Sequence, residues 1–126
     1  MLHKKLRAFQ YAYKGIAVAW KDEFHFRVDV FVSAILIIAS LFFQITAMEW
    51  VIVILVCGAQ LSVEIINTAL EELCDIHTLE HNPQIAKIKD LGAAAALITG
   101  IAAFIVGVII FYPYVHTLLY GYDFLA

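Results

Sequence analysis

Charged residues are scarce in this sequence of 126 residues, and that scarcity excludes an ordinary soluble domain. Only 15% of the residues are Asp, Glu, Lys or Arg, whereas 63% are hydrophobic. A soluble domain has about a quarter of its residues charged and roughly half of them apolar. The composition therefore predicts a protein that is embedded in a membrane.

Cysteine is also rare, and the common ligand-binding motifs are missing. The two cysteines, Cys57 and Cys74, would lie about 25 Å apart on one continuous helix, which is too far for a disulfide. The sequence contains no H-E-x-x-H zinc motif, no G-x-x-x-x-G-K-[ST] and no G-x-G-x-x-G. We therefore expect no disulfide framework, and any ATP must be held by an unconventional site.

Three apolar segments are long enough to cross the hydrocarbon core of a bilayer, which takes about 20 residues. We predict an all-α membrane protein with one membrane-embedded domain over residues 1–126. A short connection at 44–49 joins the first two spans, and a longer polar loop at 76–90 precedes the third. The expected spans are residues 28–46, 49–75 and 88–113.

Basic residues are absent from the 44–49 connection and from the chain after Lys89. Six of the eight precede the first span, and Lys87 and Lys89 lie between the second and the third. Loops that carry Lys and Arg stay in the cytoplasm. We therefore expect the N-terminus and the 76–90 loop in the cytoplasm and the C-terminus outside.

The segment before the first span predicts an amphipathic helix over about residues 2–24. Its apolar residues recur every three or four positions, as one face of a helix requires. Such a helix lies in the membrane interface, where it can act as an anchor or handle a substrate. The apolar stripe consists of Leu2, Leu6, Phe9, Tyr13, Ile16, Trp20 and Phe24.

Carboxylates occupy the inner end of the second span, although they are expensive in hydrocarbon and usually functional there. Four polar residues share an arc of about 80° on this helix. Counted from Trp50 at the outer side, Glu64 lies about 9 Å below the cytoplasmic boundary. This acidic stripe, which runs from the membrane interior to the cytosol, consists of Glu64, Asn67, Glu71 and Asp75.

The predicted topology brings further charges to the same rim, because Glu23 precedes the first span and Lys89 and Asp90 precede the third. Mg²⁺ is commonly held by one or two carboxylates together with substrate phosphates. A lysine can offset phosphate charge, and the deeper Glu64 can take a proton from a lipid hydroxyl. These are the parts that phosphoryl transfer needs.

Two other interpretations of the acidic stripe remain open at this point. It can be a polar seam between membrane helices, or part of an ion or proton path. A seam rarely needs three carboxylates. A path would stop midway, because residues 50–63 offer no acidic continuation.

Residues 63–75, VEIINTALEELCD, resemble the signature E-x-x-N-[ST]-A-[IL]-E-x-x-x-D of the small prokaryotic diacylglycerol kinase family, which includes undecaprenol kinases. Y-x-x-KG at 11–15, AW-x-x-E ending at Glu23 and AKIKDLGAAAALI at 86–98 match as well. The resemblance implies a homotrimer in the bacterial plasma membrane, with a surface helix and three transmembrane helices per subunit. It also implies phosphorylation of a membrane lipid alcohol by ATP and Mg²⁺ at the cytoplasmic interface, with no nucleic-acid partner.

The resemblance further implies roles for individual residues. Glu64 would be the catalytic base, and Glu23 and Glu71 would be metal ligands. Asn67 and Asp75 would orient the site. The residues expected to contact nucleotide are Lys4, Tyr11, Glu23, Glu71, Glu80, His81, Asn82, Lys89 and Asp90. Those expected to contact the lipid are Tyr13, Trp20, Arg27, Glu64 and Ala93.

Local features divide between two lipid substrates. ITAMEW (45–50), HNP (81–83) and GVIIFYP (107–113) resemble the undecaprenol branch of the family, as does Ala93. YAYKG and AW-x-x-E resemble the diacylglycerol branch, and His25 stands where undecaprenol relatives often have asparagine. We expect undecaprenol as the substrate, with diacylglycerol as the alternative.

Overall fold

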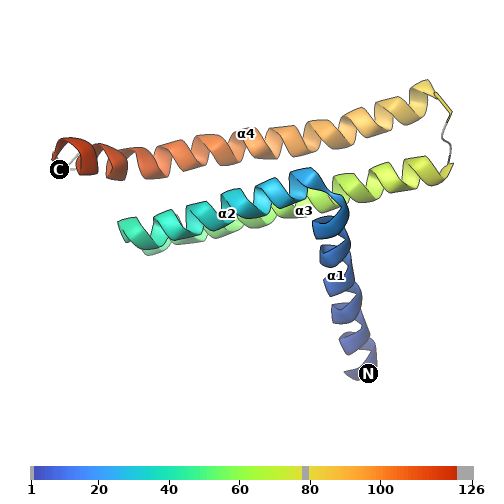
Figure 1. The fold of residues 1–126 in the computed structure, drawn as a ribbon, viewed down its shortest axis with the longest axis horizontal. Coiled ribbons are helices and arrows are strands. Elements are labelled where there is room, and N and C mark those ends of the chain that lie inside the picture. The colour runs from blue at the N-terminus through green and yellow to red at the C-terminus, as the bar shows by residue number, and fades with distance from the viewer. Residues whose placement is uncertain (1, 78–79, 122–126) are drawn as a thin grey trace.

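The computed structural model describes residues 2–77 and 80–121, with side chains from residue 4 onward. These described residues form four helices, which confirms the expected all-α class. Their arrangement is shown in Figure 1. The helices are α1 (Leu2–Asp22), α2 (Phe24–Phe43), α3 (Ala47–His77) and α4 (Pro83–Tyr120).

The helices α2, α3 and α4 run lengthwise together, and each is long and apolar enough to cross a membrane. Both α2 and α4 pack mainly against α3. At 1.5 Å per residue, α3 and α4 are about 46 and 57 Å long, which exceeds a hydrocarbon core of about 30 Å. These two helices therefore extend beyond the membrane.

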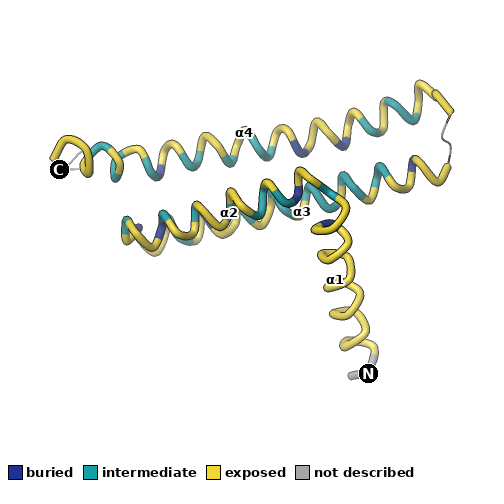
Figure 2. The backbone as a smooth tube through the Cα atoms, viewed as in Figure 1, coloured by how far each residue is buried: buried dark blue, intermediate teal, exposed yellow. Residues whose placement is uncertain are grey.

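Little of this bundle is buried, as Figure 2 shows. A small core near the α2–α3 turn joins Ile45, Val53 and Ile110. Apolar side chains such as Phe104 and Ile109 stay exposed along the helices. Lipid tails are as apolar as these side chains, so exposure to hydrocarbon carries no penalty for them.

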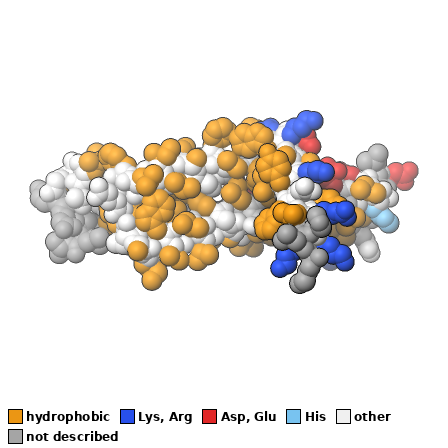
Figure 3. All heavy atoms as spheres, turned by 90° about the horizontal axis from the view of Figure 1, so that it is seen from below, with side chains coloured by type: hydrophobic (Ala, Val, Ile, Leu, Met, Phe, Trp, Pro, Cys, Tyr) orange, Lys and Arg blue, Asp and Glu red, His pale blue; other side chains and the backbone are white. Residues whose placement is uncertain are grey.

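Helix α1 leaves the bundle steeply, close to the start of α2 (Figure 1). The two helices meet at Glu23, whose backbone is extended at φ −106° and ψ 114°. Phe9 and Tyr13 on α1 are 77% and 75% exposed. Figure 3 shows Lys and Arg gathered in one part of the face in view, whereas hydrophobic side chains are spread along much of the rest.

A tight connection links α2 to α3 and ties both to α4. Gln44 adopts a left-handed conformation at the end of α2, with φ 51°. Thr46 and Glu49 then form a capping box at the start of α3, where the Glu49 carboxylate accepts the Thr46 backbone N–H at 2.8 Å. The Tyr114 hydroxyl of α4 donates to the same carboxylate at 2.6 Å.

The expected loop at 76–90 is wrong in extent, because α3 continues to His77 and α4 begins at Pro83. Asn82 caps α4 by accepting from the backbone N–H groups of Gln84 and Ile85, and proline suits the first position of a helix. Residues 76–77 and 83–90 therefore belong to helix ends, which extend beyond the membrane. At its other end α4 continues past the expected limit of 113, through Pro113 to Tyr120.

Candidate active site

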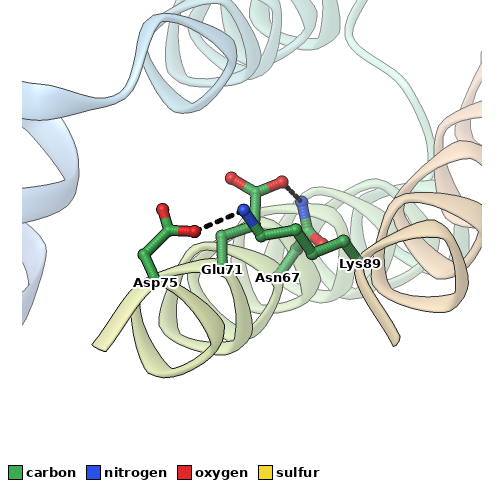
Figure 4. A network of polar contacts seen from close by, with 4 residues as sticks. All are labelled: Asn67, Glu71, Asp75 and Lys89. Carbon is green, nitrogen blue, oxygen red and sulfur yellow. Dashed lines mark hydrogen bonds and ion pairs between the residues drawn. The ribbon is translucent and has the colours of Figure 1, made fainter. Parts of the chain in front are cut away.

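The acidic stripe of α3 lies on one face of the helix, as its spacing predicts. The Asn67 Nδ2 atom donates a hydrogen bond to Glu71 Oε1 at 3.4 Å, and Figure 4 shows the two side chains together. Glu64, Asn67 and Glu71 are half-buried, whereas Asp75 is exposed. The stripe therefore passes from a partly enclosed region to an open one.

Lys89 of α4 joins the open end of this stripe. Its side chain reaches across to α3, where Nζ forms an ion pair with Asp75 Oδ1 at 2.5 Å (Figure 4). The charge of Glu71 also acts on Lys89. The predicted meeting of Lys89 with the stripe is thus confirmed for Asp75, while the neighbouring Asp90 is exposed on α4.

The start of α2 carries a second group of charged residues, which act on Glu64 of the acidic stripe. Glu23, at the corner between α1 and α2, lies within electrostatic range of Glu64. So do His25 and Asp29 on α2 and Glu71 on α3. Charged groups of α2, of α3 and of the α1–α2 corner therefore all act on the Glu64 carboxyl group.

One polar contact near Glu64 was missed by the sequence reasoning. Gln60 Nε2 on α3 donates to Asp29 Oδ2 on α2 at 2.9 Å. Gln60 lies one helical turn before Glu64, on the same side of α3. That spacing was a usable signal, and Asp29 stood out as a lone acidic residue within the first expected span.

The Asp29–Gln60 pair lines part of a groove that is formed by α2, α3 and α4. The groove has a volume of about 600 Å³. Apart from Asp29, Gln60 and Ser33, aliphatic and aromatic side chains make up most of its lining. A long apolar chain fits this surface, with a polar group at the Asp29 end.

Several residues expected to bind ligands make structural contacts, and others are exposed. Arg27 Nη1 donates to the Trp20 and Lys21 carbonyl oxygens, both at 2.9 Å, and so caps the end of α1. The Trp20 ring packs 6.0 Å from that of Phe31. Asn82 caps α4. The others are exposed, either on α1, in the α3–α4 connection or on α4: Lys4, Tyr11, Tyr13, Glu80, His81 and Ala93.

The donor set suits a cation that is shared with phosphate oxygens. Among residues 2–77 and 80–121, no group of three or more His, Cys, Asp or Glu side chains is arranged to hold a metal ion on its own. Mg²⁺ needs only one or two carboxylates when substrate phosphates complete its coordination. Glu23 and Glu71 stay the predicted pair of carboxylates for such a shared ion.

Comparison with known proteins identifies the same family that the sequence motifs resemble. Residues 10–111 match the family model described as prokaryotic diacylglycerol kinase. An undecaprenol kinase of Bacillus subtilis is 29% identical over 112 residues, 89% of this chain and 91% of the relative. A diacylglycerol kinase of Escherichia coli is 30% identical over 100 residues, 79% of this chain and 82% of the relative. One from Pseudomonas aeruginosa is 32% identical over 97 residues, 77% and 79% of the two chains.

Proposed function

The chain belongs to the prokaryotic diacylglycerol kinase family, and we propose that it transfers the γ-phosphate of ATP to the hydroxyl group of a membrane lipid, undecaprenol. Lipid kinase activity follows from the family, and the three long apolar helices make the chain an integral membrane protein. The proposal for the site depends on one observation above all. Glu64 lies one helical turn after Gln60, whose side chain is hydrogen-bonded to Asp29 in the lining of an apolar groove.

In the proposed reaction, Glu64 accepts the proton of the lipid hydroxyl while the lipid oxygen attacks the γ-phosphorus of ATP. The bond from that phosphorus to the β–γ bridging oxygen breaks, and ADP leaves. Glu23 and Glu71 would hold Mg²⁺, which neutralises charge on the phosphate oxygens when it is bound. Lys89 offsets further phosphate charge at the open end of the stripe, and Asn67 orients Glu71 through its hydrogen bond.

Asp75 forms an ion pair with Lys89, and the two are exposed enough for phosphate to compete. The ion pair has side-chain exposures of 35% for Lys89 and 50% for Asp75. An exposed pair of this kind is weak. We therefore propose that Lys89 transfers from Asp75 to nucleotide phosphate as ATP binds.

The proposed membrane placement follows from the same geometry. The N-terminus and the α3–α4 connection would face the cytoplasm, as the positions of Lys and Arg favour. Helix α1 would lie in the interface, because it leaves the bundle steeply and exposes apolar side chains (Figure 1). A homotrimer, with the remaining apolar surface shared between subunits and lipid, completes the proposal.

The groove favours undecaprenol over diacylglycerol as the substrate. Its lining is mostly apolar, and the polar side chains are Ser33, Tyr112 and the Asp29–Gln60 pair. A polyprenol carries one hydroxyl and otherwise only hydrocarbon, so it leaves no polar group unpaired in such a groove. Diacylglycerol carries two ester carbonyls that need hydrogen-bond donors when they are buried. Diacylglycerol stays the second candidate, since several relatives are named for it.

The test is a parallel assay in detergent micelles with radiolabelled ATP and either undecaprenol, diacylglycerol or ceramide. We expect labelled undecaprenyl phosphate as the main product, and its loss when EDTA removes Mg²⁺. Labelled phosphatidic acid as the main product would replace the proposed substrate with diacylglycerol. ATP-independent ion flux through liposomes, with no labelled lipid, would contradict the proposed reaction.

A further inference from the structure

Gly92 is buried where α4 passes the acidic stripe of α3. A β-carbon built at this position would overlap the Oδ1 atom of Asn67. It would also lie 3.5 Å from Asn67 Cγ and 3.5 Å from Leu70 Cδ1, which are ordinary contacts. The amide oxygen of Asn67 therefore occupies space that exists only because residue 92 has no side chain.

The Asn67 amide is held between two helices by this arrangement. Its Nδ2 atom donates to Glu71, and its Oδ1 atom is turned the opposite way, toward Gly92. Within the described part of the chain, Oδ1 is buried and has no hydrogen-bond partner. An ionised carboxylate such as that of Glu71 can only accept hydrogen bonds, so the NH₂ end of the Asn67 amide must face it. The missing side chain at position 92 therefore leaves the space that the oxygen end occupies.

We infer that Gly92 is a positioning residue for the phosphoryl-transfer site, acting through the orientation of Asn67 on Glu71. This inference rests on the proposed function, in which Glu71 is a ligand of Mg²⁺. A side chain at position 92 must either rotate the Asn67 amide away from Glu71 or move α4 away from α3. Rotation of the amide would remove the N–H donor that fixes the orientation of the Glu71 carboxylate.

The experiment compares Gly92→Ala with Gly58→Ala in the full-length protein. Gly58 is a matched control, since it also lies inside a spanning helix and a β-carbon there meets no atom within 4 Å. We expect Gly92→Ala to lower lipid phosphorylation roughly 10- to 100-fold and to raise the Mg²⁺ concentration for half-maximal activity. The half-saturating lipid concentration should stay unchanged.

A second comparison places both changes in one chain. Asn67→Ala removes the atom that a β-carbon at position 92 would meet, so Gly92→Ala should add no more than about a twofold loss in that background. Thermal unfolding in micelles is measured for every variant. If Gly92→Ala unfolds the protein, the Asn67→Ala background should restore folding.

Three outcomes would overturn the inference. In the first, Gly92→Ala is as active as Gly58→Ala. In the second, Gly92→Ala lowers activity as much in the Asn67→Ala background as in the wild type. In the third, Gly92→Ala unfolds the protein and Asn67→Ala does not restore folding. Failure of the proposed function would be visible separately, because the wild type and Gly58→Ala would then phosphorylate no lipid.

Discussion

Replacing Arg27 by alanine should release the end of α1 from the start of α2. The Arg27 guanidinium donates to the carbonyl oxygens of Trp20 and Lys21, which have no partner within the helix. A cation at this end also meets the negative end of the helix dipole. The corner that these contacts fix contains Glu23, one of the proposed metal ligands.

The size of the effect can be set from these contacts. A hydrogen bond that involves a charged group contributes about 1.5–3 kcal/mol when it is buried. Arg27 is only half-buried, and both bonds come from one nitrogen. We therefore expect Arg27→Ala to weaken the docking free energy of α1 by about 1–2 kcal/mol, which changes the ratio of docked to released α1 by roughly 5- to 30-fold. Lipid phosphorylation should fall because Glu23 loses its fixed position.

The fluorescence of Trp20 reports the position of α1 directly, since its ring packs against Phe31. Trp50 is the other tryptophan of the chain, and Trp50→Phe leaves Trp20 as the single reporter. In that background Arg27→Ala should lower the anisotropy of Trp20, while Lys21→Ala serves as the control for a lost surface charge. Arg27→Lys should lie between Arg27→Ala and the parent.

Arg27 was expected from the resemblance to contact the lipid, and the two roles make different forecasts. A lipid contact alone would raise the half-saturating lipid concentration and leave Trp20 unchanged. The capping role is refuted if Arg27→Ala matches Lys21→Ala in both anisotropy and activity.

Two further changes test opposite ends of the molecule. Lys89→Gln should lower phosphorylation by about 100-fold and raise the half-saturating ATP concentration. Thermal unfolding should not change, because the ion pair with Asp75 is exposed. Unchanged ATP kinetics would contradict a contact between Lys89 and phosphate. Tyr114→Phe removes the hydrogen bond to Glu49 and should destabilise the folded protein by about 1–2 kcal/mol in denaturant titrations, with activity retained. Lost activity at full stability would argue against a purely structural role for Tyr114.

The acidic stripe could be predicted from the sequence because helical spacing determines which residues share a face. Asn67 and Glu71 are hydrogen-bonded in the structure, and Lys89 reaches Asp75 as the topology required. Both relationships depend on the helical period and on the order of the spans. The ion pair also needs α4 to lie beside α3, but a long lysine side chain makes it tolerant of their exact distance.

Features that depend on packing angles could not be predicted in this way. Arg27 caps α1 only because α1 turns steeply at Glu23. The contact between Gly92 and Asn67 depends on the distance between α3 and α4. The polar segment at 76–90 was interpreted as a loop because hydropathy does not separate a loop from a helix end outside the membrane. Asn82 and Pro83 carried the missing signal for the start of α4.

The most direct test of the central claim compares Glu64→Gln with Glu72→Gln for Mg-ATP-dependent lipid phosphorylation. Glu72 is the matched control, because it lies on the same helix but is exposed and off the stripe. If Glu64 accepts the proton of the lipid hydroxyl, Glu64→Gln should lower the maximal rate by about 10²–10⁴-fold, and Glu72→Gln should stay within about twofold of the wild type. A Glu64→Gln enzyme as fast as Glu72→Gln would contradict the proposed role of Glu64 and the site built around it.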